Sequence, residues 1–118
     1  MNETKNAIIK STHLGVEDHG IMTAYLHLDY GGSSQSFGGW ALDEPLHDKE
    51  KKFLGRRGTG VGMEFVMCIL DTLKVGSWEK LPGTHCRVVA DYGKVSKIGH
   101  IIEDQWFEPA ELMRKAQP

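Results

Sequence analysis

Apolar and polar residues alternate along the chain between Met22 and Asp29, and this is its clearest local pattern. The apolar positions are Met22, Ala24, Leu26 and Leu28, and the polar ones are Thr23, Tyr25, His27 and Asp29. A period of two predicts a strand with one buried face. Turn-forming residues precede it at Asp18-His19-Gly20 and follow it at Gly31-Gly32-Ser33, which predicts a β-meander.

A third short strand is predicted from Gln35 to Trp40. It ends in Phe37-Gly38-Gly39-Trp40, where two glycines leave room for another backbone or a ligand between two aromatic rings. The polar stretch from Asp43 to Lys52 contains Pro45 and has no periodicity, so we expect a mobile loop there.

Apolar residues at helical spacing then predict one long helix: Phe65, Met67, Ile69, Leu70 and Leu73. Thr59 is the expected N-cap, and Gly76 the expected stop. The helix is apolar around most of its circumference, which favours a sheet on one side and another subunit on the other, and hence a homo-oligomer.

The last third predicts a second hairpin and a helical tail. Strands from Cys86 to Asp91 and from Val95 to Ile102 flank a reversal at Tyr92-Gly93, and Pro109 opens a short C-terminal helix. We therefore expect a single α+β domain over residues 1–118. It should have an antiparallel sheet of about five strands, one long helix packed on it and a short C-terminal helix.

Composition limits the possible partners. The net charge of −2 argues against a general binder of long nucleic acids, so any nucleotide partner should be small.

Cys68 and Cys86 lie in apolar runs and are expected to be reduced and buried. The N-terminus has no apolar signal segment, and the longest apolar run is too short to span a membrane, so we expect a soluble intracellular protein.

A basic, glycine-rich segment precedes the long helix. Arg56 and Arg57 offer guanidinium groups, and Gly58, Thr59 and Gly60 offer backbone N–H groups at a helix N-terminus, a combination suited to a pyrophosphate. The segment lacks the Lys-Ser or Lys-Thr ending of a P-loop, and its third glycine falls one place early for the dinucleotide fingerprint. A solvated basic loop before an ordinary helix start explains the same residues equally well.

Aromatic rings are candidates for stacking on an adenine. They are Phe37, Trp40, Trp78, Tyr92 and Trp106, and most are expected in the core or at a subunit interface. Tyr92 lies at a predicted hairpin tip and is the least expected to be buried. Its neighbours Asp91 and Lys94 could contact a ribose and a phosphate, although a plain turn explains this tip slightly better.

Catalytic and metal-binding residues are not evident. The Glu17-Asp18-His19 segment precedes a turn glycine and is more typical of a structural turn than of an acid–base pair. The histidines are scattered without zinc-ligand spacing, and there is no Gly-x-Ser-x-Gly motif. We therefore expect no catalytic residue, no metal and no cofactor.

Three segments carry a family resemblance. The runs are LGVEDHGIMTAYLHLDYGGSSQSFGGWALD, SWEKLPGTHCRV and GKVSKIGHIIEDQWFEP. This pattern resembles the first type of Thoeris anti-defence protein, a phage-encoded sponge for cyclic ADP-ribose-like immune signals, and covers nearly the whole chain from Ile8 to Pro109. The resemblance implies a bacteriophage protein that acts in the cytoplasm of the infected bacterial host. It would bind glycocyclic ADP-ribose without cleaving it.

Members of that family are oligomers, which implies a dimer or a hexamer, and some hold cyclic di- or trinucleotides at a separate site. We place phosphate contacts on Arg56, Arg57 and the Gly58–Gly60 backbone, and base or ribose contacts on Phe37, Asp91, Tyr92 and Lys94. Two other functions stay open. The protein could inhibit a host protein by direct binding, or it could be a small nucleotide-cleaving enzyme that uses Asp18 and His19.

Overall fold

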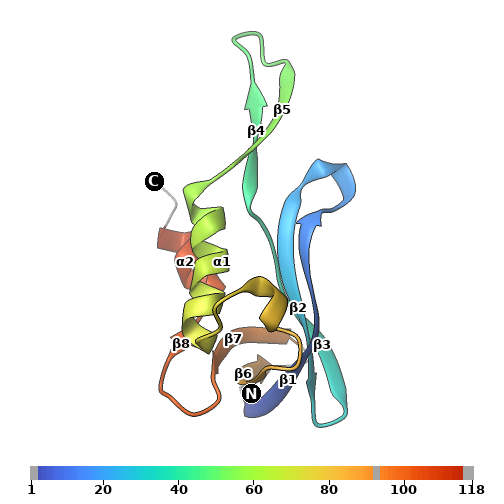
Figure 1. The fold of residues 1–118 in the computed structure, drawn as a ribbon. Coiled ribbons are helices and arrows are strands. Elements are labelled where there is room, and N and C mark those ends of the chain that lie inside the picture. The colour runs from blue at the N-terminus through green and yellow to red at the C-terminus, as the bar shows by residue number, and fades with distance from the viewer. Residues whose placement is uncertain (1–2, 92–93, 116–118) are drawn as a thin grey trace.

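The computed structural model describes residues 3–91 and 94–115 and has the predicted α+β architecture (Figure 1). A curled antiparallel sheet of six strands has the order β3-β2-β1-β6-β7-β8, and a separate two-stranded sheet pairs β4 with β5. The strands are β1 (Glu3–Val16), β2 (Met22–Tyr30), β3 (Ser33–Ala41), β4 (Asp43–His47), β5 (Phe53–Gly58), β6 (His85–Asp91), β7 (Lys94–His100) and β8 (Trp106–Phe107). The helices are α1 (Gly60–Leu73) and α2 (Pro109–Lys115), with single 3₁₀ turns at Asp18–Gly20 and Trp78–Lys80.

The long strand β1 joins the two halves of the large sheet. Its first part, Glu3–Ile8, pairs with β6, and its second part, Ile8–Val16, pairs with β2. A register shift between Ile9 and Ser11, just after the two parts meet at Ile8, bends the strand. The predicted meander is confirmed, and its turns use left-handed backbone at His19-Gly20 and Gly31-Gly32.

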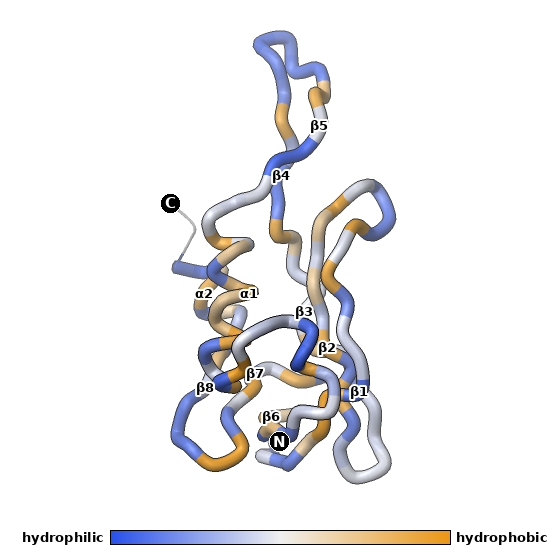
Figure 2. Tube along the Cα trace, in the orientation of Figure 1, coloured by the Kyte–Doolittle hydropathy of each residue, from blue (hydrophilic) through white to orange (hydrophobic). Residues whose placement is uncertain are grey.

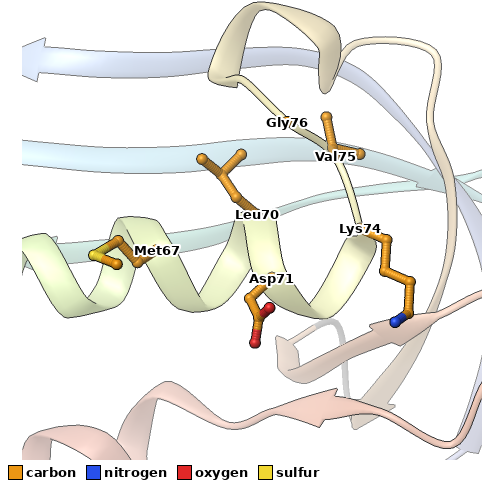
Figure 3. Close-up of a pocket in the computed structure, with 6 residues that line it drawn as sticks. All are labelled: Met67, Leu70, Asp71, Lys74, Val75 and Gly76. Carbon is orange, nitrogen blue, oxygen red and sulfur yellow. The ribbon is translucent and has the colours of Figure 1, made fainter.

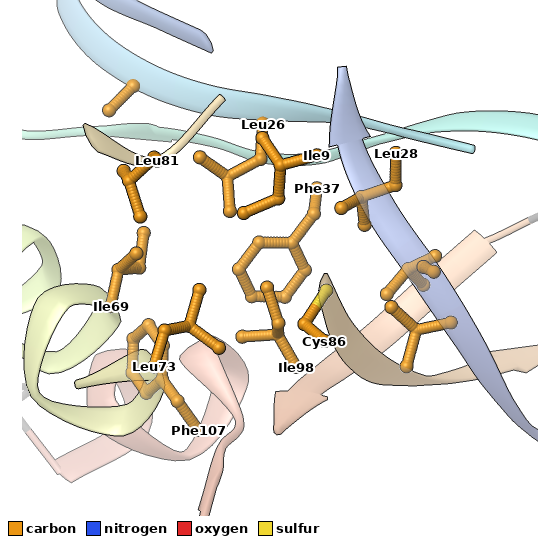
Figure 4. Packing of buried hydrophobic residues seen from close by; sticks show 14 of the residues in the cluster. Ile9, Leu26, Leu28, Phe37, Ile69, Leu73, Leu81, Cys86, Ile98 and Phe107 are labelled. Atoms are coloured by element: carbon orange, nitrogen blue, oxygen red, sulfur yellow. The ribbon is translucent and has the colours of Figure 1, made fainter. Parts of the chain in front are cut away.

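The core lies between the concave face of the sheet and α1 (Figure 4). Phe65, Ile69 and Leu73 of α1 point into it, as the helical spacing predicts. The fully buried sheet residues opposite them include Ile9, Ala24, Leu26, Leu28, Cys86, Val88 and Ile98. Cys86 is buried as predicted, whereas Cys68 is only half-buried, and both thiols are free.

Helix α1 begins as predicted and ends earlier than predicted. The Thr59 hydroxyl accepts a hydrogen bond from the Gly62 N–H at 3.0 Å, so Thr59 is the N-cap. The predicted stop at Gly76 is wrong, because Lys74 takes the left-handed C-cap conformation, with φ 56°. The Val75 N–H then donates to the Leu70 carbonyl at 3.0 Å and closes the helix end.

The expectation of a mobile loop from Asp43 to Lys52 is also wrong. The segment forms β4 and the tip of a hairpin with β5, which we call the arm (residues 43–58). At the tip, the Asp48 Oδ1 atom accepts hydrogen bonds from the N–H groups of Glu50 and Lys52, both at 2.8 Å. These two bonds fix the turn. In the part of the chain that the structure describes, β4 and β5 pair only with each other, and neither has a fully buried residue. No periodic pattern therefore marks them in the sequence.

Gly62 fixes the distance between α1 and the sheet. A Cβ atom at this position would overlap the Leu42 carbonyl oxygen and lie 2.8 Å from the Leu42 Cα. We predict that Gly62→Ala lowers the free energy of unfolding by about 2 kcal/mol or more, since overpacking typically costs about 1–3 kcal/mol. Urea unfolding measures this. Gly60→Ala is the matched control because a Cβ there meets nothing within 4 Å, and equal stability of the two variants would contradict the prediction.

Candidate ligand-binding site

A cavity of about 390 Å³ lies where the curled sheet brings β3 close to β7. Among the described residues both strands have free edges there, because β3 is the last strand of the sheet and β8 pairs with β7 only at Ile98 and Gly99. We call this the seam cavity. Its lining residues are Ser36, Phe37, Gly38, Gly39, Trp40, Lys94, Val95, Ser96, Pro109 and Ala110.

A β-bulge in β3 shapes one wall of the seam cavity. Thr23 pairs with Ala41 and Tyr25 with Gly38, so β3 carries one extra residue between these pairs. Gly38 has φ 115°, and a Cβ there would lie 2.5 Å from the Ala24 carbonyl oxygen. Only glycine fits this position, and the bulge therefore depends on it.

A buried hydroxyl holds the bulge in place. Thr23 is 6% exposed, and its Oγ1 donates to the Trp40 carbonyl at 2.8 Å. This bond fixes the backbone that carries the Trp40 side chain at the cavity. The alternating pattern of β2 predicted that Thr23 faces away from the core, so its role was not visible in the sequence.

The cavity presents one exposed ring and one exposed cation. Trp40 is 39% exposed, whereas the neighbouring Phe37 is 1% exposed and its ring lies 6.3 Å from that of Phe107 in the core. Phe37 therefore forms part of the cavity floor, and Trp40 offers the ring on which a base could stack. Lys94 is exposed on the opposite strand.

The hydroxyls of Ser36 and Ser96 add polar groups on the two walls. The Ser36 Oγ lies 3.1 Å from His27 Nδ1, and the Ser96 Oγ donates to the Val89 carbonyl at 3.4 Å. Both oxygens keep lone pairs that could accept a ribose hydroxyl. Neither serine is recognisable as a ligand contact from the sequence, because a serine within a strand belongs to no motif.

The structure brings together some of the predicted ligand contacts. Phe37 and Lys94 line the seam cavity, and Asp91 is the strand partner of Lys94 at the end of the β6–β7 hairpin. Tyr92 lies outside the described residues. The Phe-Gly-Gly-Trp motif was the sequence signal for this cavity. Gly38 admits the Ala24 backbone, and a Cβ at Gly39 would meet nothing within 4 Å.

The basic glycine-rich segment lies at the base of the arm and does not line the seam cavity. The Arg56 guanidinium donates two hydrogen bonds to the Asp43 carboxylate, from Nε and Nη2, both at 2.9 Å. Asp43 also accepts the Met22 N–H at 3.1 Å, and its side chain is 7% exposed. The hydrogen bonds from Arg56 hold the pKa of Asp43 below its usual value, and Asp43 raises that of Arg56.

The other members of that segment also have protein partners. Arg57 Nε contacts Glu44 at 3.3 Å in an exposed pair, and the Thr59 hydroxyl donates to the Leu42 carbonyl at 3.1 Å as well as capping α1. Asp43 already accepts from the Nε and Nη2 groups of Arg56, so a phosphate bound here would compete with Asp43 for these donors. Phosphate binding by Arg56, Arg57 and the Gly58–Gly60 backbone stays a prediction.

A second, open cavity of about 380 Å³ lies on the outer face of the sheet and includes Glu17, Asp18, Tyr25 and Gly39. The Tyr25 hydroxyl donates to Glu17 at 2.8 Å, and this bond to a carboxylate raises the Tyr25 pKa. His19 takes a left-handed turn conformation, with φ 68°. The geometry matches the structural-turn interpretation of Glu17-Asp18-His19.

The described residues offer few other groups for catalysis or metal binding. Burial raises the pKa of the Cys86 thiol to about 12 and also raises that of Cys68, so both are weak nucleophiles. Within residues 3–91 and 94–115, no three His, Cys, Asp or Glu side chains are grouped as metal ligands. The described part of the chain has no helix with the length and apolar character needed to cross a bilayer.

Fold and site together define an α+β domain with a ligand-sized cavity at the seam of a curled sheet. Comparisons of the chain with known protein families, with curated proteins and with solved structures give no match.

The Asp43–Arg56 pair predicts a pH-dependent contribution to stability. The pKa of the Asp43 carboxyl is lower in the folded state than in the unfolded chain. Its stabilising contribution is therefore complete above the pKa of the unfolded state and is lost as the pH falls through the pKa of the folded state. Asp43→Asn should therefore lower the free energy of unfolding most at neutral pH and least in strong acid. Urea unfolding from pH 7 downwards measures this, and a constant difference between Asp43→Asn and the parent protein would contradict it.

Proposed function

We propose that this protein binds and sequesters a cyclic ADP-ribose-like nucleotide, with glycocyclic ADP-ribose as the leading candidate, without cleaving it. The single observation that supports the proposal most is the seam cavity, which combines the Trp40 ring, the Lys94 ammonium and the glycine backbone of the bulge. The choice of ligand, and of a phage-infected bacterial cytoplasm as the place of action, follows what the sequence resemblance implies.

The chemistry of the cavity suits the parts of such a ligand. Its volume of about 390 Å³ lies within the range of small-molecule sites, about 300–1,000 Å³. A purine could stack on Trp40, a contact worth about 1–3 kcal/mol. Lys94 could pair with a pyrophosphate, and the hydroxyls of Ser36 and Ser96 could bond a ribose.

Sequestration needs a slow release rate and no chemical step. A bulge held by the Thr23–Trp40 hydrogen bond is preorganised, which lowers the entropic cost of binding. The absence of cleavage remains a prediction, as does the homo-oligomeric state.

Thermal melting against a ligand panel tests the proposal first. The panel contains cyclic ADP-ribose isomers and cyclic di- and trinucleotides, and bound ligand is recovered by boiling and identified by mass. A ligand at 100 times its dissociation constant should add about 2.7 kcal/mol of stability and raise the Tm by on the order of 10 °C. Recovery of cleaved ligand would favour the enzyme, and an unchanged Tm throughout would favour the inhibitor of a host protein.

Substitution of Lys94 then locates the site. Lys94→Gln should weaken binding about 10- to 100-fold, because a charge-assisted hydrogen bond contributes about 1.5–3 kcal/mol. Lys97→Gln is the matched control, since Lys97 lies on the same strand but does not line the cavity. Calorimetric titration gives the affinities. If Arg57→Gln weakens binding and Lys94→Gln does not, the phosphate site lies at the basic segment and the seam assignment is wrong.

A further inference from the structure

The second half of strand β1 has a neighbouring strand on only one side. Strand β2 pairs with β1 from Ile8 to Val16, whereas β6 pairs with it only from Glu3 to Ile8. Among the described residues, no strand pairs with the other side of β1 from Lys10 to Val16. We call this stretch the β1 edge (residues 10–16).

The connection from α1 to β6 covers this side of β1 only as far as Ile9. It leaves the helix beside an open cavity of about 420 Å³, whose lining includes Val75 and Gly76 (Figure 3). Its last residues reach β1, where the Gly83 N–H donates to the Ile9 carbonyl at 2.7 Å and the Ile9 N–H to the Thr84 carbonyl at 3.0 Å. Beyond this point, Figure 1 shows the end of the β1–β2 hairpin lying apart from α1.

Three residues of the β1 edge direct their backbone groups to the open side. The Glu17 N–H donates to the Ile21 carbonyl at 2.9 Å, so the Glu17 backbone faces the β2 side of the hairpin. Alternate residues of an antiparallel strand bond to the same neighbour, so the backbone groups of Thr12, Leu14 and Val16 face the other way. Within the described ranges, these N–H and C=O groups have no backbone partner. They can therefore bond the backbone of an added strand.

Two apolar side chains of the β1 edge are incompletely covered. Leu14 lies opposite Ala24 and Val16 lies opposite Met22, so both share the inner face of the sheet. Ala24 is fully buried, yet Leu14 is 40% exposed and Val16 is 64% exposed. The cover of the inner face thus ends at β1 here. Apolar side chains on a further strand would pack beside Leu14 and Val16 and extend that cover.

The β1 edge lacks the features that usually protect an exposed strand edge. Such edges typically carry prolines, charged side chains or a bulge that prevents pairing. Residues 11–16 read Ser-Thr-His-Leu-Gly-Val and include no proline, lysine or acidic residue, and the register shift of β1 precedes them. The edge is therefore suited to pairing with another strand.

Charged residues at the two ends of the β1 edge define which partner sequence fits. Lys10 stands at one end, and Asp18 follows the other end in the hairpin tip, which Figure 2 shows as hydrophilic. Both side chains are exposed, and within the described ranges neither has an ion-pair partner. An antiparallel strand with a basic residue near its N-terminus and an acidic residue near its C-terminus would complement both charges.

We propose that the β1 edge binds an extended segment of a partner protein by strand addition. The segment runs antiparallel to β1 and bonds to the backbone groups of Thr12, Leu14 and Val16. Its apolar residues occupy alternate positions, opposite Leu14 and Val16 on the inner face. A basic residue near its N-terminus pairs with Asp18, and an acidic residue near its C-terminus pairs with Lys10. The proposal rests neither on the seam cavity nor on its ligand.

Fluorescence polarisation with synthetic peptides tests the proposal. The probe is the labelled peptide Lys-Thr-Val-Thr-Val-Thr-Val-Thr-Glu, which should bind saturably. In the proposed register the valine N–H groups face β1 and the threonine N–H groups face away, because residues that exchange hydrogen bonds share a face. N-methylation of the valines should therefore weaken binding at least tenfold. N-methylation of the threonines is the matched control and should leave the affinity within about threefold.

Variants and amide exchange locate the bound peptide on the protein. Leu14→Ser/Val16→Ser should weaken binding at least tenfold, whereas Ile102→Ser, at a residue 82% exposed outside the edge, should leave it unchanged. Circular dichroism confirms that each variant is folded. The amides of Thr12, Leu14 and Val16 should exchange quickly in the free protein and slowly with the peptide, as NMR measures.

Three results would overturn the proposal. The first is no binding of the unmethylated peptide, and the second is equal binding of the two methylated peptides. The third is protection of the Thr12, Leu14 and Val16 amides without peptide, which would mean that another segment or a second copy already fills the edge.

Discussion

The structure depends on the close contact between the Leu42–Asp43 segment, strand β2 and the start of α1. The Leu42 N–H donates to the Met22 carbonyl at 2.8 Å, and the Leu42 carbonyl accepts the Thr59 N–H at 3.2 Å. Gly62 packs directly on the same peptide. Asp43 then binds both Met22 and Arg56. The large sheet, the arm and helix α1 thus meet at Leu42 and Asp43. The contacts of these two residues set the orientation of the three elements relative to one another.

The seam cavity follows from the way the sheet closes. A curled sheet that stops short of a barrel leaves two strand edges facing one another, and unpaired backbone groups at such edges favour either aggregation or binding. Here the bulge at Gly38–Trp40 turns the β3 edge aside and exposes a tryptophan. The same irregularity therefore protects the edge and forms the wall of the candidate site.

The sequence predicted those parts of the fold that have a buried face. Alternation identified β2, helical spacing identified α1, and glycine pairs identified the turns of the meander. The arm was not predicted, because both of its faces are exposed. The ion pair between Asp43 and Arg56 was not predicted either, since it forms across that hairpin. Strand β7 ends at His100, short of the predicted Ile102, because the His100 Nδ1 accepts the N–H groups of Ile102 and Glu103. At the seam cavity, Phe37 and Lys94 could be predicted from their positions in the local sequence. The roles of Thr23 and Ser96 depend on contacts that form only in the tertiary structure.

The candidate ligand site and the arm are connected along the chain by a very short segment. Trp40 belongs to the bulge, Ala41 and Leu42 follow, and the arm begins at Asp43. Thr23 holds one end of this segment through the Trp40 carbonyl, and Arg56 holds the other through Asp43. A ligand that reorients Trp40 would therefore act on the backbone that leads into the arm.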